Sequence, residues 1–86
     1  MPTICTFFGI FIRMYHDDHN PPHFHVYYGE YTAIINIETL EIMEGNLPKR
    51  AMSMVVEWAI QYRKDLINNW RKAVEHEPLD QIKPLE

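Results

Sequence analysis

Apolar and polar side chains alternate with a period of two along the first half of the chain, the pattern of strands that bury one face. The alternation predicts strands over residues 10–16, 23–28 and 31–38, and a short fourth strand over residues 40–43. Gly29-Glu30 is expected to form a two-residue hairpin turn, because glycine supplies the positive φ that a type II′ turn requires. The side chains expected to face the core are Ile10, Ile12, Met14, Phe24, Val26, Tyr28, Ala33, Ile35 and Ile37.

Apolar residues recur at spacings of three and four in the second half, which predicts an amphipathic helix. The helix is expected to begin close to Pro48, because proline is favoured in a first helical turn, and to continue to about Glu75. Its apolar stripe consists of Ala51, Val55, Ala59, Tyr62, Leu66, Trp70 and Ala73. Unbroken, it would be about 42 Å long at roughly 1.5 Å per residue, longer than a small sheet can bury. We therefore expect a kink near Asn68-Asn69 or a projecting end that meets a partner.

These elements predict an α+β fold, in which an antiparallel sheet of three to four strands is followed by one long C-terminal helix packed on one face. The 86 residues suit a single domain, which is expected to span residues 1–76. Residues 77–86 contain two prolines and several acidic side chains, and they are expected to form a tail that leaves the domain.

Composition narrows the classes of protein. With 47% hydrophobic and 13% aromatic residues, the chain is expected to fold rather than to be disordered. The single Cys5 excludes an intramolecular disulfide framework and a cysteine-based zinc site, and it favours a cytoplasmic setting. The longest apolar run, residues 7–12, reads as one buried strand and is far shorter than the roughly 20 residues that span a bilayer, so no membrane association is expected.

Histidines give the strongest chemical signal, because four of the five lie between residues 16 and 25. His23 and His25 are expected to share one strand face, about 7 Å apart at the backbone, a separation that two ligands of one metal ion can close. With His19 and Asp18, they form a candidate site for Zn²⁺ or Ni²⁺. A structural alternative is a rigid loop in which a histidine bonds backbone groups around Pro21-Pro22, with the other histidines exposed.

A third interpretation needs neither metal nor cofactor. The alternation places a group of polar and aromatic side chains on the outer sheet face: Arg13, Tyr15, His23, His25, Tyr27, Asn36 and Glu38. In a ribonuclease-like site, His23 or His25 would serve as general acid or base and Arg13 would stabilise phosphate charge. Tyr15 or Tyr27 would position a base by stacking. A solvated sheet face also carries such residues, so the pattern alone does not separate the interpretations.

The predicted helix offers a second surface. Apolar side chains outside its main stripe widen its buried face and predict a homodimer or a small protein partner: Met52, Val56, Ile60, Ile67 and Val74. Residues 49–72 hold six basic and two acidic side chains, which suits phosphates or an acidic partner. The whole chain carries a net charge of -4, which argues against a general nucleic-acid binder but not against a local basic face.

Six short segments form a distinctive set: Met1-Pro2-Thr3-Ile4, Phe7-Phe8-Gly9-Ile10, Asp18-His19-Asn20-Pro21-Pro22-His23-Phe24-His25, Tyr28-Gly29-Glu30, Glu57-Trp58 and Asn69-Trp70. Together they resemble the bacterial domain of unknown function family 4160 over nearly the whole chain. The resemblance implies that His19, His23 and His25 belong to the family motif, and that His16 is additional. It also implies a two-gene module similar to toxin and antitoxin pairs, in which the neighbour is another short protein of family 2442. It implies no particular activity.

Two functional hypotheses follow. In the first, the chain is a cytoplasmic bacterial protein of a toxin-antitoxin-like module that acts on RNA through its outer His/Arg/Tyr cluster. In the second, it is a non-catalytic protein-binding or regulatory module with a rigid His-Pro recognition loop, with or without a bound metal. Whether the protein is an enzyme stays open at this point.

Overall fold

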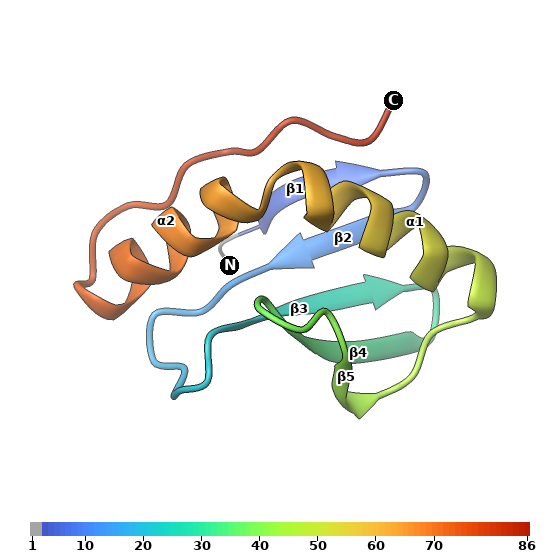
Figure 1. Cartoon of the computed structure of the whole chain (residues 1–86), viewed down its shortest axis with the longest axis horizontal. Coiled ribbons are helices and arrows are strands. Elements are labelled where there is room, and N and C mark those ends of the chain that lie inside the picture. The colour runs from blue at the N-terminus through green and yellow to red at the C-terminus, as the bar shows by residue number, and fades with distance from the viewer. Residues whose placement is uncertain (1–2) are drawn as a thin grey trace.

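A computed structural model describes residues 3–86, so Met1 and Pro2 of the predicted domain lie outside the described residues. Its five strands form one antiparallel sheet in which every strand pairs with its neighbour in sequence (Figure 1). The strands are β1 (Thr3–Phe7), β2 (Ile10–Arg13), β3 (His23–Tyr28), β4 (Tyr31–Asn36) and β5 (Ile42–Gly45), and the helices are α1 (Lys49–Gln61) and α2 (Arg63–Val74). The α+β fold is confirmed, with more strands than expected and a divided helix.

The additional strand arises from a turn inside the apolar run 7–12, which was expected to form one strand. Phe8 and Gly9 both have positive φ, at 49° and 79°, and the chain reverses there so that Phe7 pairs with Ile10. Positive φ at both central residues is the geometry of a tight hairpin turn that matches strand twist. The run is apolar on both sides of the turn because β1 and β2 both contribute to the core. The Gly29-Glu30 hairpin forms as expected, with Tyr28 paired to Tyr31.

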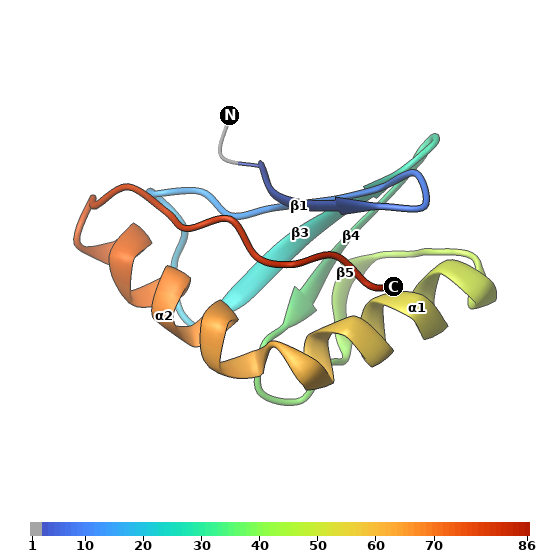
Figure 2. The same cartoon turned by 90° about the horizontal axis from the view of Figure 1, so that it is seen from above.

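One face of the sheet packs against both helices (Figure 2). The predicted core positions of the strands are buried, apart from Tyr28, which packs against the core from its border. Trp58 of α1 is fully buried and lies between two strands' aromatic rings, 5.5 Å from Phe7 and 6.1 Å from Phe24 between ring centroids. The period-two and period-3.6 patterns therefore identified the buried faces correctly.

The helical segment begins after Pro48, as expected, but it breaks at Tyr62 rather than near Asn68-Asn69. Tyr62 has φ −116° and ψ 26°, outside the helical range, and Figure 2 shows the change of direction between α1 and α2. The bend keeps both helices against the twisted sheet. Within residues 3–86, no helix has both the length and the apolar character needed to cross a membrane.

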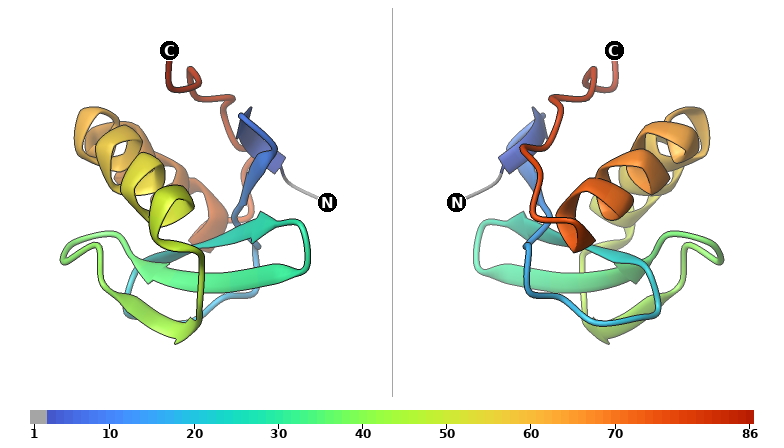
Figure 3. Two further views of the ribbon diagram at one scale, coloured as in Figure 1. Left: turned by 90° about the vertical axis from the view of Figure 1, so that its right-hand side faces the viewer. Right: turned by 90° about the vertical axis from the view of Figure 1, so that its left-hand side faces the viewer.

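The C-terminal segment packs on the domain, so the expectation that residues 77–86 lead away from it is wrong. The Ile82 amide donates to the Ile4 carbonyl at 2.8 Å, and the side chains of Ile82 and Leu85 are buried. The Trp58 indole donates to the Lys83 carbonyl at 2.8 Å. Figure 3 shows this segment beside β1, where it covers a sheet edge whose backbone groups would otherwise lack partners.

Candidate functional site

The sheet face opposite the helices gathers the predicted site residues of β2 and β3. Arg13 lies opposite His25, and Phe11 lies opposite Tyr27, so these side chains form two adjoining rows across the strands. Tyr15 joins them from the loop after β2, with its hydroxyl 2.7 Å from that of Tyr27. Alternation along the strands therefore brought four of the five predicted catalytic residues onto one surface.

Arg13 is fixed by two neighbours. Its Nε donates to Thr3 Oγ1 at 3.0 Å, and its guanidinium carbon lies 4.7 Å from the centre of the Tyr27 ring. Such a cation–π contact orients the planar guanidinium against the ring. Its positive charge also lowers the pKa of Tyr27, against the larger opposite effect of Tyr15, so the guanidinium lies beside the tyrosine pair.

Three side chains converge at the end of this surface. Asp18 Oδ2 lies 3.2 Å from His23 Nε2 and 3.0 Å from His25 Nε2. All three atoms lie within 4.8 Å of one another. The side chains of Asp18, His23 and His25 are 22%, 9% and 16% exposed, so the cluster is largely buried but remains in contact with solvent. This group is called the Asp-His-His cluster below.

Each imidazole of the cluster is held in place from a second side. His23 Nδ1 lies 2.8 Å from the Pro21 carbonyl oxygen, and because a carbonyl only accepts, this nitrogen carries the hydrogen. The His25 ring meets the Tyr15 ring edge-on, 4.7 Å between centroids. Pro21 belongs to the loop between β2 and β3, in which the Asn20-Pro21 bond is cis.

His23 differs from its predicted position. It was expected to point outward, but it is buried, and its ring lies 5.1 Å from that of Trp70 in α2. His23 is the first residue of β3, where α2 covers the end of the strand, so alternation alone does not give its environment. The sequence offered no signal for the contact with Trp70, which is 47 positions away (70 minus 23).

Other predicted residues lie elsewhere. His19 is exposed and outside the cluster, and His16 Nε2 lies 3.1 Å from the Glu77 carbonyl, against the C-terminal segment. Asn36 Oδ1 accepts hydrogen bonds from the amides of Glu38 and Thr39, which makes it part of a turn rather than of the outer surface. Of the four predicted metal ligands, the structure thus brings three together and leaves out His19.

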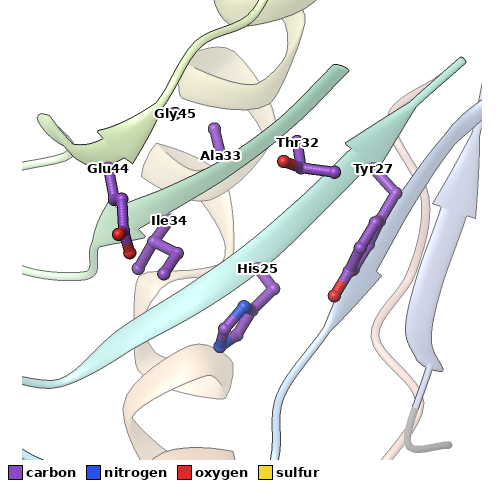
Figure 4. A pocket seen from close by; sticks show the side chains of 7 residues that line it. All are labelled: His25, Tyr27, Thr32, Ala33, Ile34, Glu44 and Gly45. Carbon is purple, nitrogen blue, oxygen red and sulfur yellow. The ribbon is translucent and has the colours of Figure 1, made fainter. Parts of the chain in front are cut away.

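A shallow groove of about 330 Å³ opens beside His25 and Tyr27 (Figure 4). Thr32 and Ile34 of β4 line it, as their predicted outward positions imply, and Glu44 of β5 closes its far side. Glu44 was not predicted because the expected fourth strand ended one residue too early. Its pairing with Ile34 places the carboxylate on the same face as the imidazole.

The hydroxyl pair of Tyr15 and Tyr27 also affects proton binding. The hydrogen bond with Tyr15, together with partial burial, raises the pKa of Tyr27 above its ordinary value. The neutral phenol is therefore the form of Tyr27 near neutral pH, with its ring against Arg13 and its hydroxyl paired with that of Tyr15.

In a comparison with protein families, residues 9–71 match the domain of unknown function DUF4160. The chain belongs to this family. The matched part of this DUF4160 protein contains Arg13, the Asp-His-His cluster, both tyrosines and Glu44, which confirms the resemblance read from the sequence. Comparisons with curated proteins and with solved structures give no match.

Proposed function

We propose that this DUF4160 protein is a cytoplasmic bacterial member of a two-gene, toxin-antitoxin-like module, and that it acts on single-stranded RNA at the outer face of its sheet. One observation carries the proposal: an arginine whose guanidinium lies against a tyrosine ring adjoins a cluster of two imidazoles and a carboxylate. Phosphate recognition and acid–base groups are the two components that RNA cleavage requires.

The surface suits a single strand better than a duplex. Phe11, Tyr27 and Tyr15 offer aromatic rings on an open sheet face, and unpaired bases stack on such rings whatever their sequence. Arg13 would hold a phosphate between stacked bases. A net charge of −4 disfavours broad contact with a polyanion, so recognition is expected to be local and short.

The chemistry follows from the positions of these groups. A base removes the proton of a ribose 2′-OH, the oxygen attacks the adjacent phosphorus, and the bond to the 5′ oxygen breaks as water gives that oxygen a proton, leaving a cyclic phosphate and a 5′-hydroxyl. Arg13 would stabilise the negative charge that develops on the phosphorus oxygens. His23 is buried against α2, whereas His25 lies opposite Arg13 on the outer sheet face, so His25 is the imidazole that a bound RNA would reach.

Cleavage of an end-labelled, unstructured RNA tests this proposal. We expect wild-type protein to yield products that end in a cyclic phosphate, and His25→Ala to lower the rate at least about 100-fold, the range expected when an acid–base group is lost. His19→Ala is the matched control, because it removes an exposed histidine outside the cluster. Absence of cleavage by wild type, or equal cleavage by His25→Ala, would reject the proposal.

The partner of the module would bind on the opposite side of the molecule. Ile60, Ile67 and Val74 recur every seven residues on the outer side of α1 and α2, and they are 61%, 40% and 55% exposed. Arg63, Lys64 and Arg71 flank this stripe at helical spacing. Two copies facing each other would bring like charges together, so we propose a small protein with an acidic helix, rather than a second copy, as its occupant.

A further inference from the structure

We infer that Asp18, His23 and His25 bind one divalent transition-metal ion, with Zn²⁺ as the preferred ion. The role of this ion in RNA cleavage rests on the proposed function, whereas the binding itself rests only on the geometry of the Asp-His-His cluster.

The ligand atoms are spaced as a metal site requires. Metal–nitrogen and metal–oxygen bonds of about 2.0–2.1 Å in a tetrahedral site place the ligand atoms about 3.3 Å apart. The two Nε2 atoms lie 3.2 Å and 3.0 Å from Asp18 Oδ2, close to that separation. The two imidazole nitrogens also lie within 4.8 Å of each other, so an ion between the three atoms needs only these side chains to close on it.

The position of the hydrogen on the His23 ring favours a cation between His23 and Asp18. Because its Nδ1 donates to the Pro21 carbonyl, the neutral imidazole presents a bare lone pair at Nε2. That lone pair faces a carboxylate oxygen 3.2 Å away, and two electron-rich atoms at this distance repel each other unless a proton or a metal ion lies between them. A metal ion satisfies both atoms at once.

The surroundings resemble those of metal-bound histidines in general. A ligating imidazole usually donates its second nitrogen to a carbonyl or carboxylate, which fixes its orientation, and the Pro21 carbonyl does this for His23. Trp70 packs on the His23 ring and Tyr15 on the His25 ring, so both ligands are held before an ion arrives. Preorganisation of this kind lowers the entropy cost of binding.

The ligand set selects the class of ion. Two imidazoles and one carboxylate suit Zn²⁺, Ni²⁺ or Fe²⁺ and disfavour Mg²⁺ and Ca²⁺, which prefer oxygen ligands. Three protein ligands leave at least one position for water, and the partial exposure of His25 and Asp18 opens that position to solvent. A water bound there ionises more readily, and as hydroxide it would be the base that takes the 2′-OH proton, with His25 acting through it as a ligand, while solvent returns a proton to the departing 5′ oxygen.

Metal content of the untagged protein is the test. After incubation with Zn²⁺ and dialysis, we expect one zinc per chain by elemental analysis, and a melting temperature that zinc raises and a chelator lowers again. Asp18→Asn, which keeps the shape of the side chain, and His25→Ala should each weaken zinc affinity at least about 100-fold, because removing even an outer partner of a ligand costs 10–100-fold. His19→Ala should bind zinc as the wild type does.

Cobalt supplies a spectroscopic check on the same ligands. Co²⁺ in place of Zn²⁺ should give the intense visible absorption of a four-coordinate site in the wild type and lose it in Asp18→Asn. Less than about 0.1 zinc per chain, or undiminished zinc binding by Asp18→Asn, would overturn the inference. The three side chains would then be held together by hydrogen bonds and not by a metal ion. Zinc binding without RNA cleavage would instead uphold the site and reject the proposed function.

Discussion

Arg13 is the residue on which RNA recognition depends in this account. Thr3 and Tyr27 hold its guanidinium from two sides, and its position opposite His25 places it beside the Asp-His-His cluster. A guanidinium that is already oriented loses less entropy when it binds a phosphate than a free side chain does. In the proposed function, Arg13 would therefore link binding of the RNA backbone to the groups that cleave it.

Replacing Arg13 by glutamine should weaken binding of a short single-stranded RNA by about 5- to 30-fold, because a charge-assisted hydrogen bond contributes about 1–2 kcal/mol. Fluorescence anisotropy at low salt measures the effect. Arg63→Gln, on the helical side of the molecule, should leave the affinity within about twofold, because single rim charges contribute little. Equal losses in both variants would mean that charge alone, and not this site, attracts the RNA.

Cys5 provides a residue-level test of the core. Burial raises the pKa of its thiol from 9.0 to about 11. The folded state therefore holds the proton more tightly than the unfolded state. The associated stability is complete below pH 9 and is lost as the pH rises toward 11, with a slope of up to about 1.4 kcal/mol per pH unit. Urea unfolding across this range should show a shallower decline for Cys5→Ala; parallel curves for the two proteins would contradict the predicted burial of the thiol.

Residue-level chemistry was only partly predictable. The types and spacing of the histidines pointed to a shared site, and alternation placed Arg13, His25 and Tyr27 on one face. Which nitrogen of His23 is free depends on the path of the proline-containing loop and the Pro21 carbonyl, and its burial depends on α2. Such long-range contacts leave no periodic signal in a sequence.

At the scale of elements, two side chains of α2 hold the C-terminal segment at Asp80: Lys72 pairs with its carboxylate at 2.7 Å, and Asn69 binds its backbone. Asn69 is buried within α2 and makes two hydrogen bonds with the backbone of Asp80, each 2.9 Å long. It thereby gives the Asp80 amide an acceptor and the Asp80 carbonyl a donor, at the point where the chain returns toward β1. Asn69 therefore attaches the C-terminal segment to α2, whereas the helix break that was expected near Asn68-Asn69 lies at Tyr62.

Asn69→Ala should lower the free energy of unfolding by about 2 kcal/mol, because it removes a buried side chain together with its two part-buried hydrogen bonds to the Asp80 backbone. Asn68→Ala is the matched control: its side chain accepts only an exposed hydrogen bond from Arg71, and the change should cost less than about 0.5 kcal/mol. Urea denaturation compares the two variants. A similar loss for both would mean that residues 77–86 contribute no stability to the domain.

Element boundaries show where sequence patterns are informative. The start of α1 at Pro48 and the Gly29-Glu30 turn depend on local backbone preferences, and both were predicted correctly. The turn at Phe8 was missed because a bulky residue seldom adopts positive φ, and here the hairpin imposes it. The break at Tyr62 follows the curvature of the sheet, which is a property of the assembled strands.

At the scale of the whole molecule, the fold separates two surfaces. The helices fill one face of the sheet, so the outer sheet face and the outer side of α1 and α2 point in opposite directions (Figure 2). RNA on one surface and a protein on the other would not compete for the same residues. The partner protein would then regulate this chain by binding α1 and α2, and it would leave the outer sheet face uncovered.

Ile67→Asp should therefore abolish co-purification of the protein encoded beside this one, while RNA cleavage stays unchanged. Gln61→Asp adds the same charge outside the apolar stripe and should retain the complex. Light scattering of the co-expressed pair should give the mass of a hetero-complex. A homodimer of the isolated protein that Ile67→Asp dissociates would instead assign the stripe to a second copy.

The central claim is that the outer face of the sheet acts on RNA in the cell. The most direct measurement is bacterial growth and total RNA integrity after induction of this protein alone, at matched soluble levels of wild type, His25→Ala and His19→Ala. We predict arrested growth and fragmented RNA for wild type and His19→Ala, and normal growth with intact RNA for His25→Ala. Normal growth with intact RNA for wild type, or equal arrest by His25→Ala, would contradict the claim.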